Sequence, residues 1–240
     1  KIPESYYEAF IKWEKEQHGF TVEKKWMRFS PGVVAAFHWF VQILSEPGDA
    51  VIVNTPVYYP FLHAVKNNNR KLICSDLINE DGKYHIDYED FEKKIAENQV
   101  KIFILCSPHN PAGRVWKKEE LKTLFEICRK HQVYVISDEI HHDLIFSEHP
   151  HVPSLSVGEY ADMMVAITAP SKTFNLAGGQ NSIVIIPDDK LRKKWDTFVN
   201  GIRVGSGNPF GYIAAEAAYR TGASWLESVK AQIRENEAYV

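Results

Sequence analysis

Residues 164–175 read MVAITAPSKTFN, in which an apolar run leads into a lysine set among small residues. The run 164–167 predicts a buried strand, and Ser171 directly precedes Lys172. A lysine held near the interior after such a strand would have a lowered pKa and could form an imine with a carbonyl compound. A loop lysine in solvent is the simpler interpretation when Lys172 is considered alone.

Similar apolar runs alternate with amphipathic stretches along all 240 residues, without an internal repeat or a Gly/Ser linker. The runs lack polar alternation, as is typical of strands covered on both faces. This alternation predicts a three-layer α/β fold, a mainly parallel sheet with helices on both faces. The expected strands are 50–53, 71–75, 102–106, 134–137, 164–167 and 182–186. The expected helices are 32–44, 59–67, 88–97, 118–131, 190–204 and 210–220.

Charge and composition argue against several classes of protein. The net charge is -3, with both signs spread along the chain, so we expect no nucleic-acid partner. No apolar run approaches the roughly 20 residues that a membrane span requires, so we expect no membrane partner. The three cysteines, Cys74, Cys106 and Cys128, lack the spacing of a disulfide framework or a zinc site. Reduced thiols in a cytoplasmic protein are therefore expected.

A helix start with phosphate-binding character occurs in SPGVV, residues 30–34. Proline in the first turn and Gly32 beside it leave free backbone N–H groups at a helix N-terminus. An ordinary helix cap is the commoner meaning of such a sequence, so Gly32, Val33 and Val34 are only candidates on this ground.

Asn110 lies in SPHNPAGR, residues 107–114, directly after the predicted strand 102–106. The prolines on both sides of Asn110 would fix its amide in one direction at the end of the strand. A Pro/Gly turn that uses Asn for its tolerance of turn geometry explains the pattern equally well.

The predicted strand 134–137 ends in DEIHHD, residues 138–143. A metal site would need histidine and carboxylate ligands that converge from several elements, and the adjacent His141 and His142 need not point together. No metal ligand is predicted here. Asp138, a carboxylate at the end of a buried strand, is better suited to pairing with one fixed cation, and ligands of such sheets lie beyond the carboxyl ends of the strands.

These segments, in this order, closely resemble the aminotransferase class I/II family of pyridoxal-phosphate enzymes. The more specific resemblance is to its cystathionine β-lyase (C–S lyase) subgroup of the maltose-regulon-modulator type. It implies an aspartate-aminotransferase-like large domain over residues 1–240. The motifs that carry it are YYEAF (6–10), SPGVV (30–34), TPVYYPF (55–61), CSPHNPAG (106–113), SDEIH (137–141) and SKTFN (171–175).

The resemblance implies that pyridoxal 5'-phosphate is the cofactor and gives several residues a role. Lys172 would hold the cofactor as a Schiff base and move the α-proton of the substrate. Asp138 would pair with the pyridine nitrogen and keep it protonated. Asn110 would hydrogen-bond the phenolic oxygen of the ring, with His141 a weaker candidate in the same place.

The remaining contacts implied by the resemblance concern the ring face and the phosphate. Tyr58 would stack on the ring, and Tyr59 is the alternative candidate for this contact. Many relatives have an arginine that binds the phosphate eight positions after the lysine, whereas this chain has Gln180 there. The expected phosphate-binding residues are Gly32, Val33, Val34 and Ser171.

The expected reaction is cleavage of the Cβ–S bond of cystathionine or a related cysteine conjugate, an amino-acid substrate, to a thiol, pyruvate and ammonia. An aminotransferase of the same fold is the enzymatic alternative. A regulatory protein that keeps the fold is the alternative of another class.

Helical patterns run up to both ends of the sequence, so we expect it to be part of a longer chain. The resemblance implies a C-terminal small domain beyond Val240, with an arginine that binds the substrate carboxylate. It also implies a homodimer, and the aromatic residues Tyr6, Tyr7, Phe10 and Trp13 suggest a helix too apolar for solvent.

Overall fold

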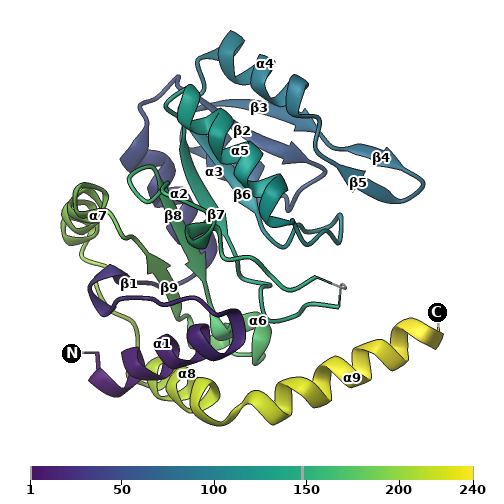
Figure 1. Cartoon of the computed structure of the whole chain (residues 1–240). Coiled ribbons are helices and arrows are strands. Elements are labelled where there is room, and N and C mark those ends of the chain that lie inside the picture. Colours follow the sequence, from purple (N-terminus) through teal and green to yellow (C-terminus); the bar gives the residue numbers. More distant parts are fainter. Residues whose placement is uncertain (1, 147–148, 240) are drawn as a thin grey trace.

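A seven-stranded sheet forms the centre of the computed structural model, which describes residues 2–146 and 149–239 (Figure 1). The strand order is β1-β9-β8-β7-β6-β2-β3, and β9 alone in this sheet runs antiparallel to its neighbours. The mainly parallel sheet expected from the sequence is thereby confirmed. The strands are β1 (Met27–Ser30), β2 (Ala50–Thr55), β3 (Lys71–Asp76), β6 (Ile102–Cys106), β7 (Tyr134–Asp138), β8 (Met164–Thr168) and β9 (Ser182–Ile185).

Helices cover both faces of this sheet and enclose two separate cores. In β2, Val51 and Val53 belong to one core, whereas Ile52 belongs to the other. Successive side chains of a strand point to opposite faces, so a strand buried on both sides is apolar at every position. The first core lies under α2 (Val33–Leu44), α3 (Pro60–Asn67) and α7 (Asp189–Ile202), and the second under α4 (Tyr88–Asn98) and α5 (Lys118–Lys130).

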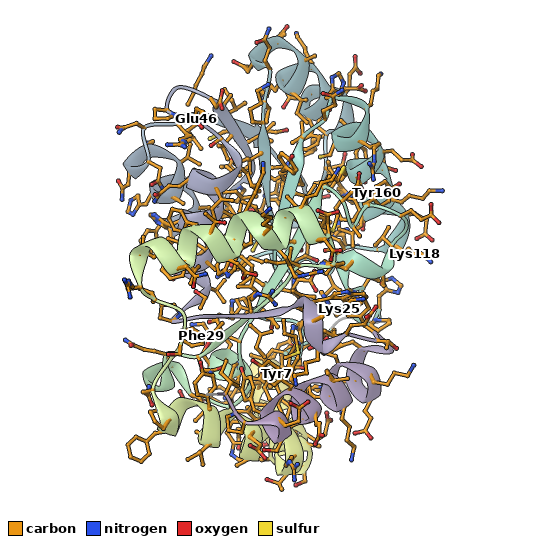
Figure 2. All side chains as sticks on the ribbon, turned by 90° about the vertical axis from the view of Figure 1, so that its left-hand side faces the viewer. Tyr7, Lys25, Phe29, Glu46, Lys118 and Tyr160 are labelled. Carbon is orange, nitrogen blue, oxygen red and sulfur yellow. The ribbon has the colours of Figure 1, made fainter. Side chains whose placement is uncertain are left out.

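A third core joins α1 (Glu4–His18) and α8 (Pro209–Thr221) to the β1–β9 end of the sheet. Figure 2 shows Tyr7 of α1 and Phe29 of β1 in this part of the molecule. Phe10 is fully buried, with its ring 5.4 Å from that of Tyr219. The aromatic face of α1 is therefore covered largely within the same chain, and it gives no reason to expect a second subunit at this helix.

The six expected strands all form, and the elements that the sequence did not predict are short. The edge strand β1 has four residues, one of them Arg28, and the exposed hairpin of β4 (Ile78–Glu80) and β5 (Lys83–His85) is largely polar. Neither carries an apolar run. Short helical segments also form at Lys24–Trp26, Ser154–Ser156, α6 (Pro170–Thr173) and Ala177–Gly179.

The last helix, α9 (Ala223–Tyr239), extends away from the rest of the molecule in Figure 1. Leu226 is its one buried residue in the described part of the chain. None of the helices among the described residues is long and apolar enough to cross a membrane.

Candidate active site

A cavity of about 260 Å³ collects the predicted site residues beside the carboxyl ends of β6, β7 and β8. This volume is just below the usual range of ligand pockets, roughly 300–1,000 Å³. Parallel strands bring the segments that follow them to one edge of the sheet, which is where such folds bind ligands. All nine residues assigned from the sequence line this cavity: Gly32, Val33, Val34, Tyr58, Asn110, Asp138, His141, Ser171 and Lys172.

Asp138 is a buried carboxyl group at the wall of this cavity. It is 4% exposed, and the backbone N–H of Ile140 donates a 3.1 Å hydrogen bond to its Oδ1. Burial raises the pKa of Asp138 to about 7, although the N–H of Ile140 and the charge of Lys172 act in the opposite direction. A cation placed in the cavity would favour the ionised carboxylate, so Asp138 suits a positively charged ligand atom.

Asn110 is held in place by its backbone. Its N–H donates a 3.3 Å hydrogen bond to Sγ of Cys106, and its carbonyl oxygen accepts a 3.0 Å hydrogen bond from the N–H of Tyr58. Cys106 is the last residue of β6 and stands opposite Asp138 in the adjacent strand. The thiol thus links the Asn110 loop to the strand end that presents the carboxylate, a contact that the sequence did not reveal.

The N-terminus of α2 faces the same cavity and has no side-chain cap. Gly32 is its N-cap residue, and a Cβ atom built there would meet nothing within 4 Å. The N–H groups of the first helical turn have no partner within the helix, and the helix dipole adds positive potential, so an anion fits here. Val33 and Val34 are the first two residues of this helix.

Lys172 lies on the short helix α6 and is more exposed than expected. The helix begins directly after β8, so its first turn carries Lys172 to the rim of the cavity rather than into the core. Ser171 and His141 are half-buried beside it. The pKa of His141 is lowered, first by burial and then by the charge of Lys172.

The two candidate tyrosines differ in their exposure and in their position relative to the cavity. Tyr58 is half-buried and lines the cavity, whereas Tyr59 is 62% exposed and does not. The structure therefore favours Tyr58 as the aromatic wall of the site and gives Tyr59 no part in it.

Further cavity residues come from the segment before and at the start of β9. Gln180, at the position where many relatives have arginine, lines the cavity together with Asn181 and Ser182. Asn181 is buried, and its Oδ1 accepts a 2.6 Å hydrogen bond from the hydroxyl of Tyr6. No local pattern marks Asn181 or Ser182 as site residues, because β9 reaches this edge only by running antiparallel to the rest of the sheet.

Comparison with known proteins gives matches over nearly the whole chain. The model of the family described as aminotransferase class I and II matches residues 3–240. Cystathionine beta-lyase PatB of Bacillus subtilis (strain 168) is 45% identical over 230 residues, which cover 95% of this chain and 59% of the relative.

Two solved structures have the same fold over the whole chain. A PLP-bound putative aminotransferase from Clostridium difficile 630 matches with a TM-score of 0.96 and 44% identity, covering 100% of this chain and 62% of that one. A PLP-bound C-S lyase from Staphylococcus hominis matches with a TM-score of 0.94 and 37% identity, covering 100% and 60%. The chain thus spans about three-fifths of the length of these relatives.

Proposed function

Because this chain belongs to the aminotransferase class I and II family, we propose that it forms the cofactor-binding large domain of a pyridoxal-phosphate-dependent C–S β-lyase. The substrate is cystathionine or a related cysteine conjugate. The observation that carries the proposal is that Lys172, Asp138, Asn110 and Tyr58 line one cavity.

The residues of the cavity fit pyridoxal phosphate at three points. The buried carboxyl group of Asp138 suits a protonated ring nitrogen, and the uncapped start of α2 at Gly32 suits a phosphate group. Lys172 would supply the amine that holds the cofactor through its aldehyde. Pyridoxal phosphate, when bound, withdraws electrons from the α-carbon of an amino acid attached to it.

The side chains of this chain have separate tasks in the reaction. Once the amino group of the substrate has displaced it from the cofactor, Lys172 would accept the proton from the α-carbon at its Nζ atom. Asp138 keeps a positive charge on the ring nitrogen, because a carboxylate beside a cation in a buried site stabilises the charged form. Tyr58 covers one side of the cavity and restricts the position of the ring. The electron pair left at the α-carbon would form a Cα–Cβ double bond as the thiolate leaves with the electrons of the Cβ–S bond, and water would then release pyruvate and ammonia.

The names of similar proteins support a lyase. Cystathionine beta-lyase PatB is 45% identical and the Staphylococcus hominis C-S lyase 37%. An aminotransferase is the second candidate, because the Clostridium difficile structure at 44% identity is named a putative aminotransferase.

Cystathionine should be given to the pyridoxal-phosphate-loaded protein, and thiol and pyruvate should be measured. Both products in equal amounts support the lyase. Transfer of the amino group to an added keto acid, without release of thiol, would establish the aminotransferase instead.

We also propose a homodimer. Phe210 and Ile213 on α8 are 80% and 61% exposed, and apolar side chains so exposed on one helix are typical of an interaction surface. Sedimentation equilibrium should give twice the chain mass, and Phe210→Asp should shift the equilibrium toward monomer. A monomer with complete activity would rule the dimer out.

A cytoplasmic location is the last part of this proposal. Cys74, Cys106 and Cys128 are all free, and the last two are buried. Free thiols are the normal state of cysteine in the reducing cytosol. Cell fractionation with antibody detection tests the location, and recovery in a secreted fraction would contradict it.

A further inference from the structure

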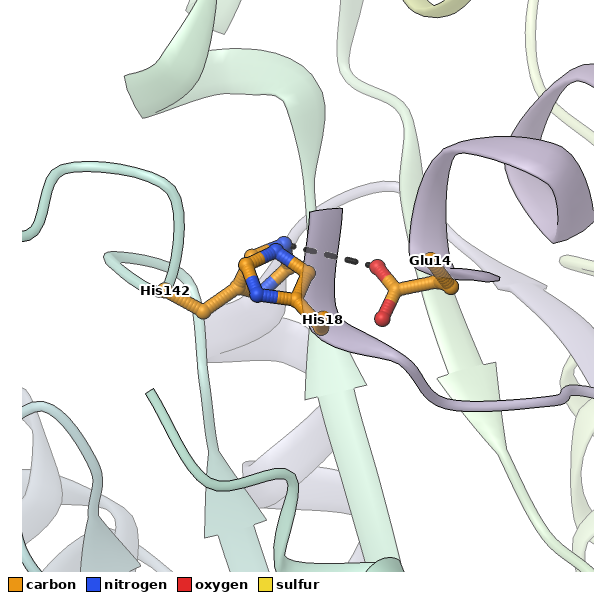
Figure 3. A group of neighbouring side chains, drawn as sticks. All are labelled: Glu14, His18 and His142. Atoms are coloured by element: carbon orange, nitrogen blue, oxygen red, sulfur yellow. Dashed lines mark ion pairs between the residues drawn. The ribbon is translucent and has the colours of Figure 1, made fainter. Parts of the chain in front are cut away.

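A buried polar cluster lies outside the proposed active site, where α1 meets the segment after β7 (Figure 3). Glu14 and His18 stand one helical turn apart on α1, while His142 and Asp143 follow β7. Glu14 is 4% exposed, His142 3% and Asp143 6%. Charged groups so deeply buried are costly unless opposite charges or a metal ion neutralise them.

The possible ligand atoms of this cluster lie close together. One ligand atom from each of Glu14, His18 and His142 lies within 4.8 Å of the other two. Nε2 of His142 is 3.4 Å from Oε1 of Glu14. Tetrahedral zinc has bonds of about 2.0–2.2 Å, which place neighbouring donors about 3.4 Å apart. The pair from Glu14 and His142 already has this spacing.

These two atoms are among four buried side-chain atoms of the described residues that lack a hydrogen-bond partner; the other two, in His109 and Asn181, lie outside this cluster. Oε1 of Glu14 and Nε2 of His142 are buried and have no hydrogen-bond partner among residues 2–146 and 149–239. Buried polar atoms in native proteins are nearly always hydrogen-bonded, and an exception often marks a position for an ion or water.

The surrounding hydrogen bonds fix the rings as metal sites do. Nδ1 of His142 lies 2.9 Å from Oγ1 of Thr168, and Nε2 of His18 lies 2.8 Å from Oδ1 of Asp143. Metal-binding histidines almost always hydrogen-bond a second group through their other ring nitrogen. When Nδ1 of His142 donates to Thr168, the lone pair of Nε2 faces carboxylate oxygens of Glu14 and Asp143 at 3.4 and 3.2 Å. That arrangement is repulsive unless a metal ion or a proton lies between them.

We propose that Glu14, His18 and His142 bind one divalent transition-metal ion, with Zn²⁺ the best match to two imidazoles and a carboxylate. Asp143 orients His18 and adds negative charge beside the ion, and a water molecule would complete the four-coordinate geometry.

The site is structural rather than catalytic. Asp143 accepts a 2.7 Å hydrogen bond at Oδ2 from the hydroxyl of Thr173, the residue after Lys172. The ion would therefore fasten α1 to the helix that carries the lysine.

The competing occupant is a proton. A doubly protonated His142 would also neutralise the carboxylates: burial disfavours that form, yet Asp143 and Glu14 together raise its pKa to about 10. The two occupants differ in a measurable way, because only the metal requires the lone pair of Nε2.

The test uses the untagged protein, stripped with a chelator and then titrated with Zn²⁺ alone. We expect one zinc per chain by elemental analysis, a higher melting temperature, and d–d absorption bands of four-coordinate geometry when Co²⁺ replaces Zn²⁺. Glu14→Gln and His142→Ala should each weaken binding at least tenfold, as loss of a direct ligand should exceed the roughly 10–100-fold effect of losing an outer partner. His63→Ala, at an exposed position of α3, is the matched control and should bind as the wild type does.

Two results would overturn the proposal. One is zinc binding that Glu14→Gln leaves unchanged. The other is a nitrogen NMR spectrum of the zinc-treated wild type in which both ring nitrogens of His142 carry protons. The spectrum and the Co²⁺ bands are measured on the wild type, so they decide the matter even when His142→Ala fails to fold.

Discussion

The backbone N–H of Tyr58 donates a 3.0 Å hydrogen bond to the carbonyl oxygen of Asn110. This bond joins the loop after β2 to the loop after β6 and makes one wall of the cavity from two distant segments. His109 strengthens the same junction, because its Nε2 lies 2.8 Å from the carbonyl oxygen of Pro56. The positions of the ring-stacking and amide side chains are therefore set together.

Tyr58→Ala should weaken pyridoxal-phosphate binding by roughly three- to tenfold, since an aromatic contact contributes about 0.5–1.5 kcal/mol beyond its buried area. Tyr58→Phe keeps the ring and should lose much less. Tyr59→Ala is the matched control, because Tyr59 lies outside the cavity. Absorbance titration with the cofactor measures all three, and equal losses for Tyr58→Ala and Tyr59→Ala would contradict the assignment.

Cys106→Ala should lower cofactor affinity by roughly fivefold. The change removes the acceptor for the N–H of Asn110, and a hydrogen bond contributes about 1 kcal/mol. Cys128→Ala removes another buried thiol, from the core beneath α5. It should reduce the free energy of unfolding without changing cofactor affinity, as measured by denaturant titration and cofactor titration. An unchanged affinity in Cys106→Ala would show that the thiol does not position the loop.

Asp138→Asn should stabilise the cofactor-free protein at pH 8. The pKa of this carboxyl group is about 7 in the folded chain and 3.8 ordinarily. The folded state therefore holds the proton more tightly, and the free energy of unfolding falls as the pH rises from about 4 to about 7, by a few kcal/mol. Asparagine has no such penalty, so its melting temperature should exceed that of the wild type at pH 8, with the difference shrinking toward pH 4.

The same variant should bind the cofactor more weakly, because the ring nitrogen loses its partner, at a cost of roughly 2–5 kcal/mol. Asp81→Asn in the exposed hairpin turn is the control and should change neither property. A wild type as stable as Asp138→Asn at pH 8 would show that burial does not penalise the charge.

Borohydride reduction of the cofactor-loaded protein should place the label on Lys172. Lys172→Arg should abolish the labelling and reduce turnover by roughly 10²–10⁴-fold, the usual contribution of a positioned proton-transfer group. Lys66→Arg, on the exposed side of α3, should be labelled like the wild type. Peptide mapping by mass spectrometry identifies the modified lysine, and a label on another lysine would reject the proposed role.

The sequence alone determined the layers of the fold and nine of the residues that line the cavity. The expected strands formed because unbroken apolar runs such as 102–106 are stable when helices bury both faces of a sheet. Asn110, Asp138 and Lys172 could be predicted to meet because each lies at or just after the end of a parallel strand, and such strands end at one edge.

Tertiary structure alone decided the contacts that depend on packing between distant elements. Short α6 carries Lys172 to the cavity rim, and the antiparallel direction of β9 brings Asn181 to the same cavity. His142 is adjacent to His141 in the sequence, yet its Nε2 atom lies 3.4 Å from Oε1 of Glu14 on α1. Local patterns record which face of an element is buried. They do not record which distant helix covers that face, because that is fixed by the packing of whole elements against one another.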